Sequence, residues 1–304
     1  MRFDSYHPMI NLIYFAAAIA GTVIFDHPVF VVIAYVSAFV YSVKLRGVRA
    51  LVLNLCLIPL IFGYTWLYSY YNHFGVTPLR ENFIGNQITL EAVAYGLQIG
   101  VSAAAVIMMV TCVFEIFSAD KVVYLFGKIS PKLSLFLSII LRCLPRLAKQ
   151  AGKVNTAQSG IGRGRSQGPV WRRLLSCIRM VSVLITWFME SIVESARSMK
   201  SRGYSLKGRT AFSIYRFDNR DRSYIIFVFL CFTITAMAVL LDQTHIYYNP
   251  QLIMNRVTPI SCVFYAAYAC FMLSPLFLQI CGEIKFKRQR SESQGAAGAA
   301  QILQ

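Results

Sequence analysis

Long apolar runs alternate with short polar connections along most of the chain. Six of these runs reach or approach the roughly 20 residues that an α-helix needs to cross the hydrocarbon core of a bilayer. The second run is the shortest of the six. The pattern predicts transmembrane helices at about residues 8–25, 28–43, 50–70, 90–117, 224–241 and 257–280.

Between the fourth and fifth runs, the apolar residues become periodic instead of continuous. From Trp171 to Met199 they recur every three or four residues, and the opposite face carries polar residues that include Glu190 and Glu194. This is the pattern of one amphipathic helix of about 30 residues. Because both glutamates would be costly in lipid, we expect this helix to lie beneath the membrane domain rather than across it.

A second amphipathic helix precedes this one. Ser130-Pro131 is a favourable start, because serine is a good N-cap and proline suits the first helical position. Pro145 is expected to kink the helix, and the glycines from Gly160 onward end it. A shorter helix is expected at 120–128. The predicted fold class is therefore an all-α polytopic membrane protein, with about six transmembrane helices plus two to three amphipathic cytoplasmic helices.

These patterns divide the chain into four parts. Residues 1–117 hold the N-terminal transmembrane helices, 118–222 the amphipathic region, and 223–283 the C-terminal transmembrane helices. Residues 284–304 form a basic tail, which we expect to be disordered from Ser291 onward. The composition agrees with a membrane protein: charged residues make up 14% of the chain, against about a quarter in soluble proteins, and the mean hydropathy is +0.55.

The 30 lysines and arginines outnumber the 13 acidic residues, which gives a net charge of +17. Residues 44–49 and 285–290 are strongly basic, whereas the connections at 69–89 and 242–256 contain only Arg80 and Arg256. The positive-inside rule therefore predicts a multi-pass plasma-membrane protein with both termini in the cytoplasm. Attraction to anionic lipid of the bilayer explains most of the remaining positive charge.

Other function classes fit the chain less well. An intramembrane enzyme needs titratable groups inside its spans, yet Glu91 and Glu115 lie near the ends of one span without a His or Asp at helical spacing. A stand-alone channel or secondary transporter would carry buried charges along its ion path. Both remain as alternatives. No nucleic-acid partner is expected, because the basic segments are interleaved with Leu and Ile rather than stacking aromatics.

The sequence also predicts no cofactor and no metal site in this chain. Its eight cysteines form no CxxC pair, and most lie in apolar runs, where they are expected to be small buried hydrophobic residues. A P-loop is absent from the sequence, so the chain is not expected to hydrolyse ATP by that route.

Two arginines follow the two amphipathic helices, each beside a glycine. The first lies in Ile161-Gly162-Arg163 and the second in Ser201-Arg202-Gly203. A cation is mildly favoured at a helix C-terminus and glycine ends helices, so either site alone would be ordinary capping. Their repetition favours recognition, because a guanidinium group binds a carboxylate through two parallel hydrogen bonds. Two such ends could dock into acidic pockets on two soluble partners.

The segments SMKSRGY, AQSGIGRG and LRCLPRLAKQAGKVNTAQ resemble the transmembrane (T) component of energy-coupling factor (ECF) transporters. In that family, two coupling helices end in short Xaa-Arg-Xaa motifs, usually Ala-Arg-Gly or Ser-Arg-Gly. Ser201-Arg202-Gly203 is similar to the second motif. At the first, a longer gap than is usual separates Ala157-Gln158 from Arg163. The resemblance covers residues 6–280, and the opening YHPMINLIYF lacks the Asp-Pro-Arg found in most of the family.

The resemblance implies a scaffold rather than an enzyme. Two cytoplasmic ABC-type ATPase subunits would bind the helix ends and would themselves hold ATP and Mg²⁺. A small membrane protein, the S component, would capture a vitamin or metal ion and dock on the scaffold. The apolar stripe of the longer amphipathic helix is the candidate surface for the S component, although packing against the spans would explain it equally well. The stripe residues that we single out are Ile178, Val181, Ile185, Phe188 and Ile192.

Overall fold

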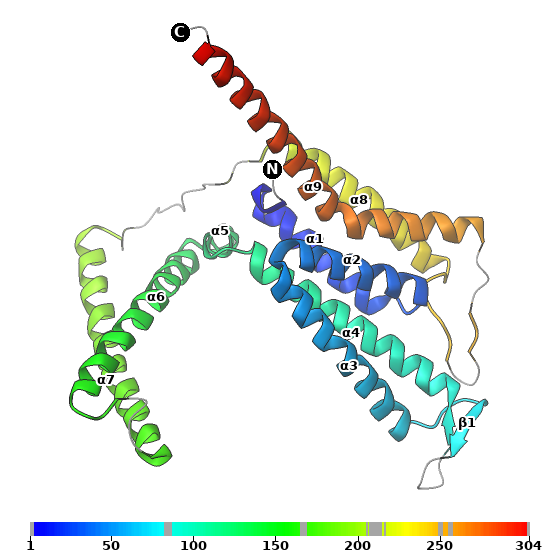
Figure 1. Ribbon diagram of the computed structural model, residues 1–304, viewed down its shortest axis with the longest axis horizontal. Helices are drawn as coiled ribbons and strands as arrows, with labels where there is room; N and C mark the ends of the chain where they lie inside the picture. Colours follow the sequence, from blue (N-terminus) through cyan, green and yellow to red (C-terminus); the bar gives the residue numbers. More distant parts are fainter. Residues whose placement is uncertain are drawn as a thin grey trace. The chain divides into compact units, whose positions relative to one another are not determined.

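The computed structural model describes residues 3–81, 87–164, 169–204, 206, 215, 217–248, 252–254 and 258–302. Helices dominate these residues, which confirms the predicted all-α polytopic membrane fold. The chain divides into two compact units (Figure 1). Unit 1 combines Met1–Ser118 with Tyr215–Gln304, and unit 2 is Ala119–Ile214.

Unit 1 contains a helix for each of the six apolar runs. Two of them begin at His-Pro pairs: His7 and His27 are N-caps whose ring Nδ1 atoms accept hydrogen bonds from the backbone N–H two residues on. Proline follows each histidine at the first helical position, where its missing N–H costs nothing. The helices of unit 1 are α1 (Pro8–Ile24), α2 (Pro28–Arg46), α3 (Val48–Tyr71), α4 (Leu90–Ile116), α8 (Asn219–Leu240) and α9 (Pro259–Ile302).

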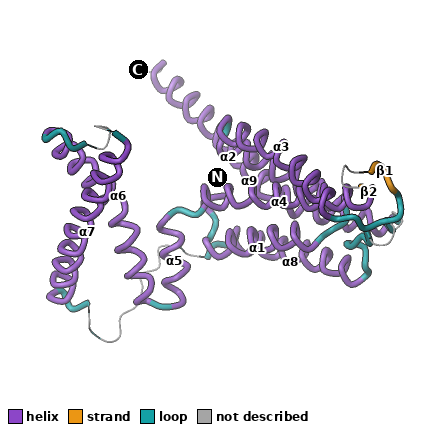
Figure 2. The backbone as a smooth tube through the Cα atoms, turned by 90° about the horizontal axis from the view of Figure 1, so that it is seen from below, coloured by secondary structure: helices purple, strands orange, loops and turns teal. Residues whose placement is uncertain are grey.

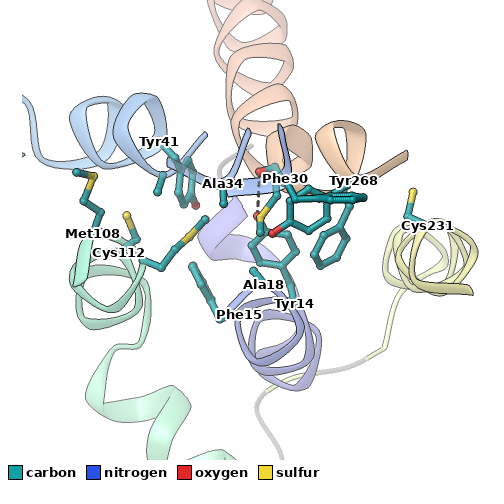
Figure 3. Close-up of a cluster of buried hydrophobic side chains, with 14 of the residues drawn as sticks. Tyr14, Phe15, Ala18, Phe30, Ala34, Tyr41, Met108, Cys112, Cys231 and Tyr268 are labelled. Atoms are coloured by element: carbon teal, nitrogen blue, oxygen red, sulfur yellow. Dashed lines mark hydrogen bonds between the residues drawn. The ribbon is translucent and has the colours of Figure 1, made fainter. Parts of the chain in front are cut away.

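The core of unit 1 is formed by residues of all six of its described long helices, including Leu57 and Ile61 of α3; Figure 3 shows part of it. Fully buried alanines such as Ala18 and Ala34 leave room for close helix packing, and aromatic rings fill the remaining space. The Tyr14 hydroxyl donates a hydrogen bond to the Met272 carbonyl at 3.0 Å, which joins α1 to α9. Small residues at helix contacts are how helices associate in a membrane, where no hydrophobic difference drives them together.

The connections between α1 and α2, α3 and α4, and α8 and α9 meet at one end of unit 1. The backbone N–H groups of Asp26 and His27 donate to the Thr244 carbonyl at 3.1 and 2.9 Å. The Gln98 amide donates to the Asp26 carboxylate at 2.7 Å. A short antiparallel hairpin of β1 (Pro78–Glu81) and β2 (Gln87–Thr89), which the apolar pattern did not predict, lies in the second of these connections.

The opposite end of unit 1 carries most of its described positive charge. Lys44 pairs with Glu283 at 2.8 Å, and Arg46 with Glu115 at 3.6 Å. The Asp218 and Asp221 side chains form a capping box at the start of α8. The Lys44 ion pair joins α2 to α9, and the Arg46 ion pair joins α2 to α4. The basic connections of the sequence thus lie at one end of unit 1, and the connections with few basic residues lie at the other.

Six described helices are long and apolar enough to cross a membrane, but they are not the six predicted. They are α2, α3, α4, α7 (Val170–Ser201), α8 and Pro259–Arg290 of α9, whereas α1, with 17 residues, is a shorter apolar helix. Helix α7 qualifies because most of its charged residues lie toward its two ends and leave an apolar middle. That α7 lies beneath the membrane stays a prediction.

The tail was predicted to be disordered from Ser291 onward, but in the structure α9 continues to Ile302. The residues GAAGAAQ contain four alanines, the best helix former. They also extend a helix that is already nucleated by the preceding span, so they avoid the cost of a first turn.

The described residues of unit 2 form three helices: α5 (Ala119–Ile129), α6 (Pro131–Gly160) and α7. Helix α6 begins at the predicted Ser130-Pro131 pair, although the Ser130 side chain makes no capping hydrogen bond. Helices α6 and α7 pack against one another (Figure 2), with the first half of α6 beside the end of α7. The hairpin thus joins two amphipathic helices of 30 and 32 residues.

Candidate functional site

Helix α7 presents three different faces. One is half-buried and recurs every three or four residues, through Cys177, Met180, Leu184, Trp187 and Ser191. Since α6 is the helix of unit 2 that packs against α7, this face is the contact with α6. A second face is charged and exposed. The third is the apolar stripe predicted from the sequence.

The stripe is largely exposed rather than packed within unit 2. Phe188 is half-buried at its border with the α6-facing side. The other four singled-out residues are exposed: Ile178 by 58%, Val181 by 52%, Ile185 by 53% and Ile192 by 38%. Unit 2 by itself therefore does not explain why these positions are apolar. A contiguous exposed apolar surface of this kind marks a place where another protein or lipid packs.

Helix α7 ends in a Schellman turn built around Arg202 and Gly203. The Gly203 N–H donates to the Lys200 carbonyl at 3.1 Å, and the Tyr204 N–H donates to the Met199 carbonyl at 3.2 Å. Gly203 has a φ of +76°, a left-handed conformation that glycine adopts without strain. Arg202 is the C-cap, and its side chain is exposed. The turn therefore places this guanidinium at the end of a rigid helix.

Helix α6 ends in a turn of the same kind. Here the Gly162 N–H donates to the Ser159 carbonyl at 3.1 Å, and the Arg163 N–H donates to the Gln158 carbonyl at 2.9 Å. Gly162 has a φ of +75° and is the counterpart of Gly203. Ile161 is the C-cap, so it is Ile161, and not Arg163, that occupies the position of Arg202.

The two predicted arginines are thus offset by two positions in otherwise matching turns. Arg202 precedes the left-handed glycine and Arg163 follows it. The sequence already shows that the arginine follows the glycine in one motif and precedes it in the other. Only the structure shows which residue caps each helix, and therefore where in the turn each arginine lies. Both arginines are exposed, and neither forms an ion pair within the part of the chain that the structure describes. Both can therefore reach a partner.

No family model matches the chain. It is 33% identical over 108 residues to the energy-coupling factor transporter transmembrane protein EcfT of Bacillus selenitireducens, and 33% identical over 96 residues to the protein of that name from Exiguobacterium sibiricum. These matches cover 35% and 31% of this chain, and the chain spans 40% and 36% of the two relatives. The resemblance to the transmembrane component of ECF transporters is confirmed over about a third of the chain.

Proposed function

We propose that this chain is the transmembrane scaffold of an ECF-type ABC importer. It couples ATP hydrolysis by two cytoplasmic ATPase subunits to the movement of a substrate-binding S component, for uptake of a vitamin or metal ion. The similarity to two proteins named EcfT supports the transporter class. Both termini lie in the cytoplasm in this proposal, as the basic end of unit 1 suggests.

The observation that carries the coupling role is the pair of helix ends in unit 2. Each of two long helices stops in a Schellman turn, and each turn presents an exposed arginine without an ion pair among the described residues. Capping alone does not require arginine, because the backbone hydrogen bonds and the glycine already end both helices. A guanidinium held in this way suits insertion into an acidic groove of an ATPase subunit.

Rigid helices allow motion at these ends to act at a distance. At 1.5 Å per residue, the 32 residues of α7 span about 48 Å. A displacement of the Arg202 end, caused by closure of an ATPase pair around ATP, is carried along α7 to its exposed apolar stripe. There it would move an S component docked on Ile178, Val181 and Ile185.

Charge reversal at the two arginines tests this proposal. Removing one partner of a buried ion pair costs about 3–5 kcal/mol, so Arg202→Glu should abolish co-purification of the ATPase subunits from native membranes. Arg163→Glu should weaken it too. The measurement is mass spectrometry of the ATPases that remain with the tagged chain after solubilisation.

Arg172→Glu is a matched control, because Arg172 is also an exposed arginine on α7 but lies near its other end. The control should retain the ATPases. If the double variant at Arg163 and Arg202 folds and still retains both ATPases and ATP-driven uptake, the coupling role is wrong.

A further inference from the structure

A groove of about 660 Å³ lies between α6 and α7, within unit 2. Arg142 and Arg146 line it from α6, and Arg202 and Glu194 line it from α7. Serines of both helices contribute further hydroxyl groups. The apolar residues of the lining include Leu135 and Ile192. The groove therefore combines a cationic, hydroxyl-rich part with an apolar part.

The charges of this groove are not balanced. Three guanidinium groups and one carboxylate leave a net charge of +2, and none of the three arginines forms an ion pair with a described residue. Arg142 and Arg146 are four residues apart, so they extend from neighbouring turns of the same helix face. Like charges in one cleft repel each other and focus a positive potential there. An anion with several oxygens, such as a phosphate group, would relieve that repulsion and accept several hydrogen bonds.

The apolar part of the groove is continuous with the exposed apolar stripe of α7. Ile192 belongs both to the groove lining and to the exposed apolar stripe of α7. Along the chain, only Phe117 and Ser118 separate α4, a candidate membrane span, from the first helix of unit 2. A ligand that carries both a phosphate and a hydrocarbon chain matches both the arginines and the apolar residues of the groove, whereas an acidic peptide matches the arginines alone.

We propose that this groove binds an anionic phospholipid, with Arg142 and Arg146 holding the phosphodiester of its headgroup. The lipid's acyl chain lies along the apolar part of the groove toward Ile192. The groove shares Arg202 and Ile192 with the ATPase and S-component proposal, but binding of lipid by this chain alone is measured without either partner.

Tryptophan fluorescence offers a direct test. Trp187 lies on the α6-facing side of α7, one turn before Ser191, which lines the groove. The only other tryptophans are Trp66 and Trp171, so a W66F/W171F variant of the full chain leaves Trp187 as the reporter. The purified variant in detergent is titrated with brominated phosphatidylglycerol and with brominated phosphatidylcholine of the same acyl chains. We expect saturable quenching by phosphatidylglycerol, at about tenfold or more lower concentration than by phosphatidylcholine.

Variants of the groove assign the effect. Arg142→Gln with Arg146→Gln should raise the half-saturating concentration of phosphatidylglycerol by about tenfold or more. Arg172→Gln with Arg179→Gln removes two exposed arginines of α7 that lie outside the groove, and should leave it unchanged. Glu194→Gln removes the one opposing carboxylate and should strengthen binding, a gain that misfolding cannot imitate.

Four results would overturn the inference. The first is equal quenching by the two lipids, and the second is an equal loss of binding in both double arginine variants. The third is competition by the deacylated headgroup glycerophosphoglycerol as strong as by the lipid, and the fourth is displacement by a glutamate-rich peptide at lower concentration than by the lipid. The third would assign the groove to free phosphate esters, and the fourth to an acidic peptide.

Discussion

At the residue scale, the two helix ends show how one glycine sets the position of a neighbouring arginine side chain. Gly162 and Gly203 both have positive φ, and each is followed by a residue whose N–H closes the outer hydrogen bond of the turn. The arginine stands before the glycine on α7 and after it on α6. The two guanidinium groups therefore leave the backbone at different points of the same turn, so the proposed ATPase grooves for them need not be alike.

A prediction at this scale concerns Gly203. A Cβ at this position would lie 3.2 Å from Leu206 Cδ1, and its φ of +76° costs an L-residue about 1–2 kcal/mol. Gly203→Ala should therefore loosen the end of α7 and weaken ATPase retention while leaving Arg202 in place. Hydrogen exchange at the amides of residues 203 and 204 should become several-fold faster.

Gly152→Ala is its control, because Gly152 lies in the interior of α6 and a Cβ there meets nothing within 4 Å. Alanine at that position should stabilise the helix by roughly 0.5–1 kcal/mol. Unchanged exchange at 203 and 204 in Gly203→Ala would show that the turn does not depend on glycine.

At the scale of the element, α7 separates its contacts by face. Its half-buried face packs on α6, its charged face carries Arg179 and Glu190, and its apolar stripe is exposed. The sequence pattern predicted one apolar and one polar side. Packing divides the apolar residues of α7 between the face that contacts α6 and the exposed stripe, and only the stripe is free to contact a partner.

A substitution on the stripe tests its role. Ile185→Asp places a charge on the exposed apolar surface, where it would have to be desolvated when an S component docks. Transport of the cognate substrate into proteoliposomes should fall about tenfold or more, while ATPase retention stays the same.

Thr186→Asp adds the same charge one residue along, on the polar side of the helix, and should leave uptake near its original rate. If both variants transport alike, the stripe is not a docking surface.

At the scale of the whole molecule, the number of crossings decides where the termini lie. Helices α1, α2, α3, α4, α8 and α9 run alternately between the two ends of unit 1, since their connections meet at one end and their ion pairs at the other. If these six cross and α7 does not, both termini lie on the same side. A single crossing by α7 would put the start of α8 on the side opposite to the end of α4. Unit 1 has both at the same end, because Asp221 of α8 accepts a hydrogen bond from the His7 N–H and Glu115 of α4 pairs with Arg46.

Reporter fusions test this arrangement. A fluorescent protein that matures only in the cytoplasm should be bright both before Met1 and after Gln304, and a periplasmic reporter at either end should be inactive. A reporter inserted in residues 82–86, within the β1–β2 connection, should show the reverse. Opposite signals from the two termini would contradict this packing of unit 1.

Local pattern determined much of this protein. Continuous apolar runs, His-Pro and Ser-Pro starts, and glycines at the ends of α6 and α7 all act through neighbouring backbone groups, so the positions of the helices could be predicted from the sequence. The glycine-arginine motifs at the ends of α6 and α7 could be predicted in the same way. Composition alone predicts disorder beyond Ser291, but these residues continue α9, because the preceding span has already nucleated the helix.

Tertiary structure decided the rest, because it depends on contacts between residues far apart in the chain. The meeting of Arg142 and Arg146 with Arg202 requires α6 and α7 to fold back on one another, and no spacing within either helix indicates it. The same holds for the joining of Asp26 to Gln98 and Thr244 at one end of unit 1. Periodicity shows which residues of a helix share a side, but only packing against a neighbour shows which of those sides remains open to a partner.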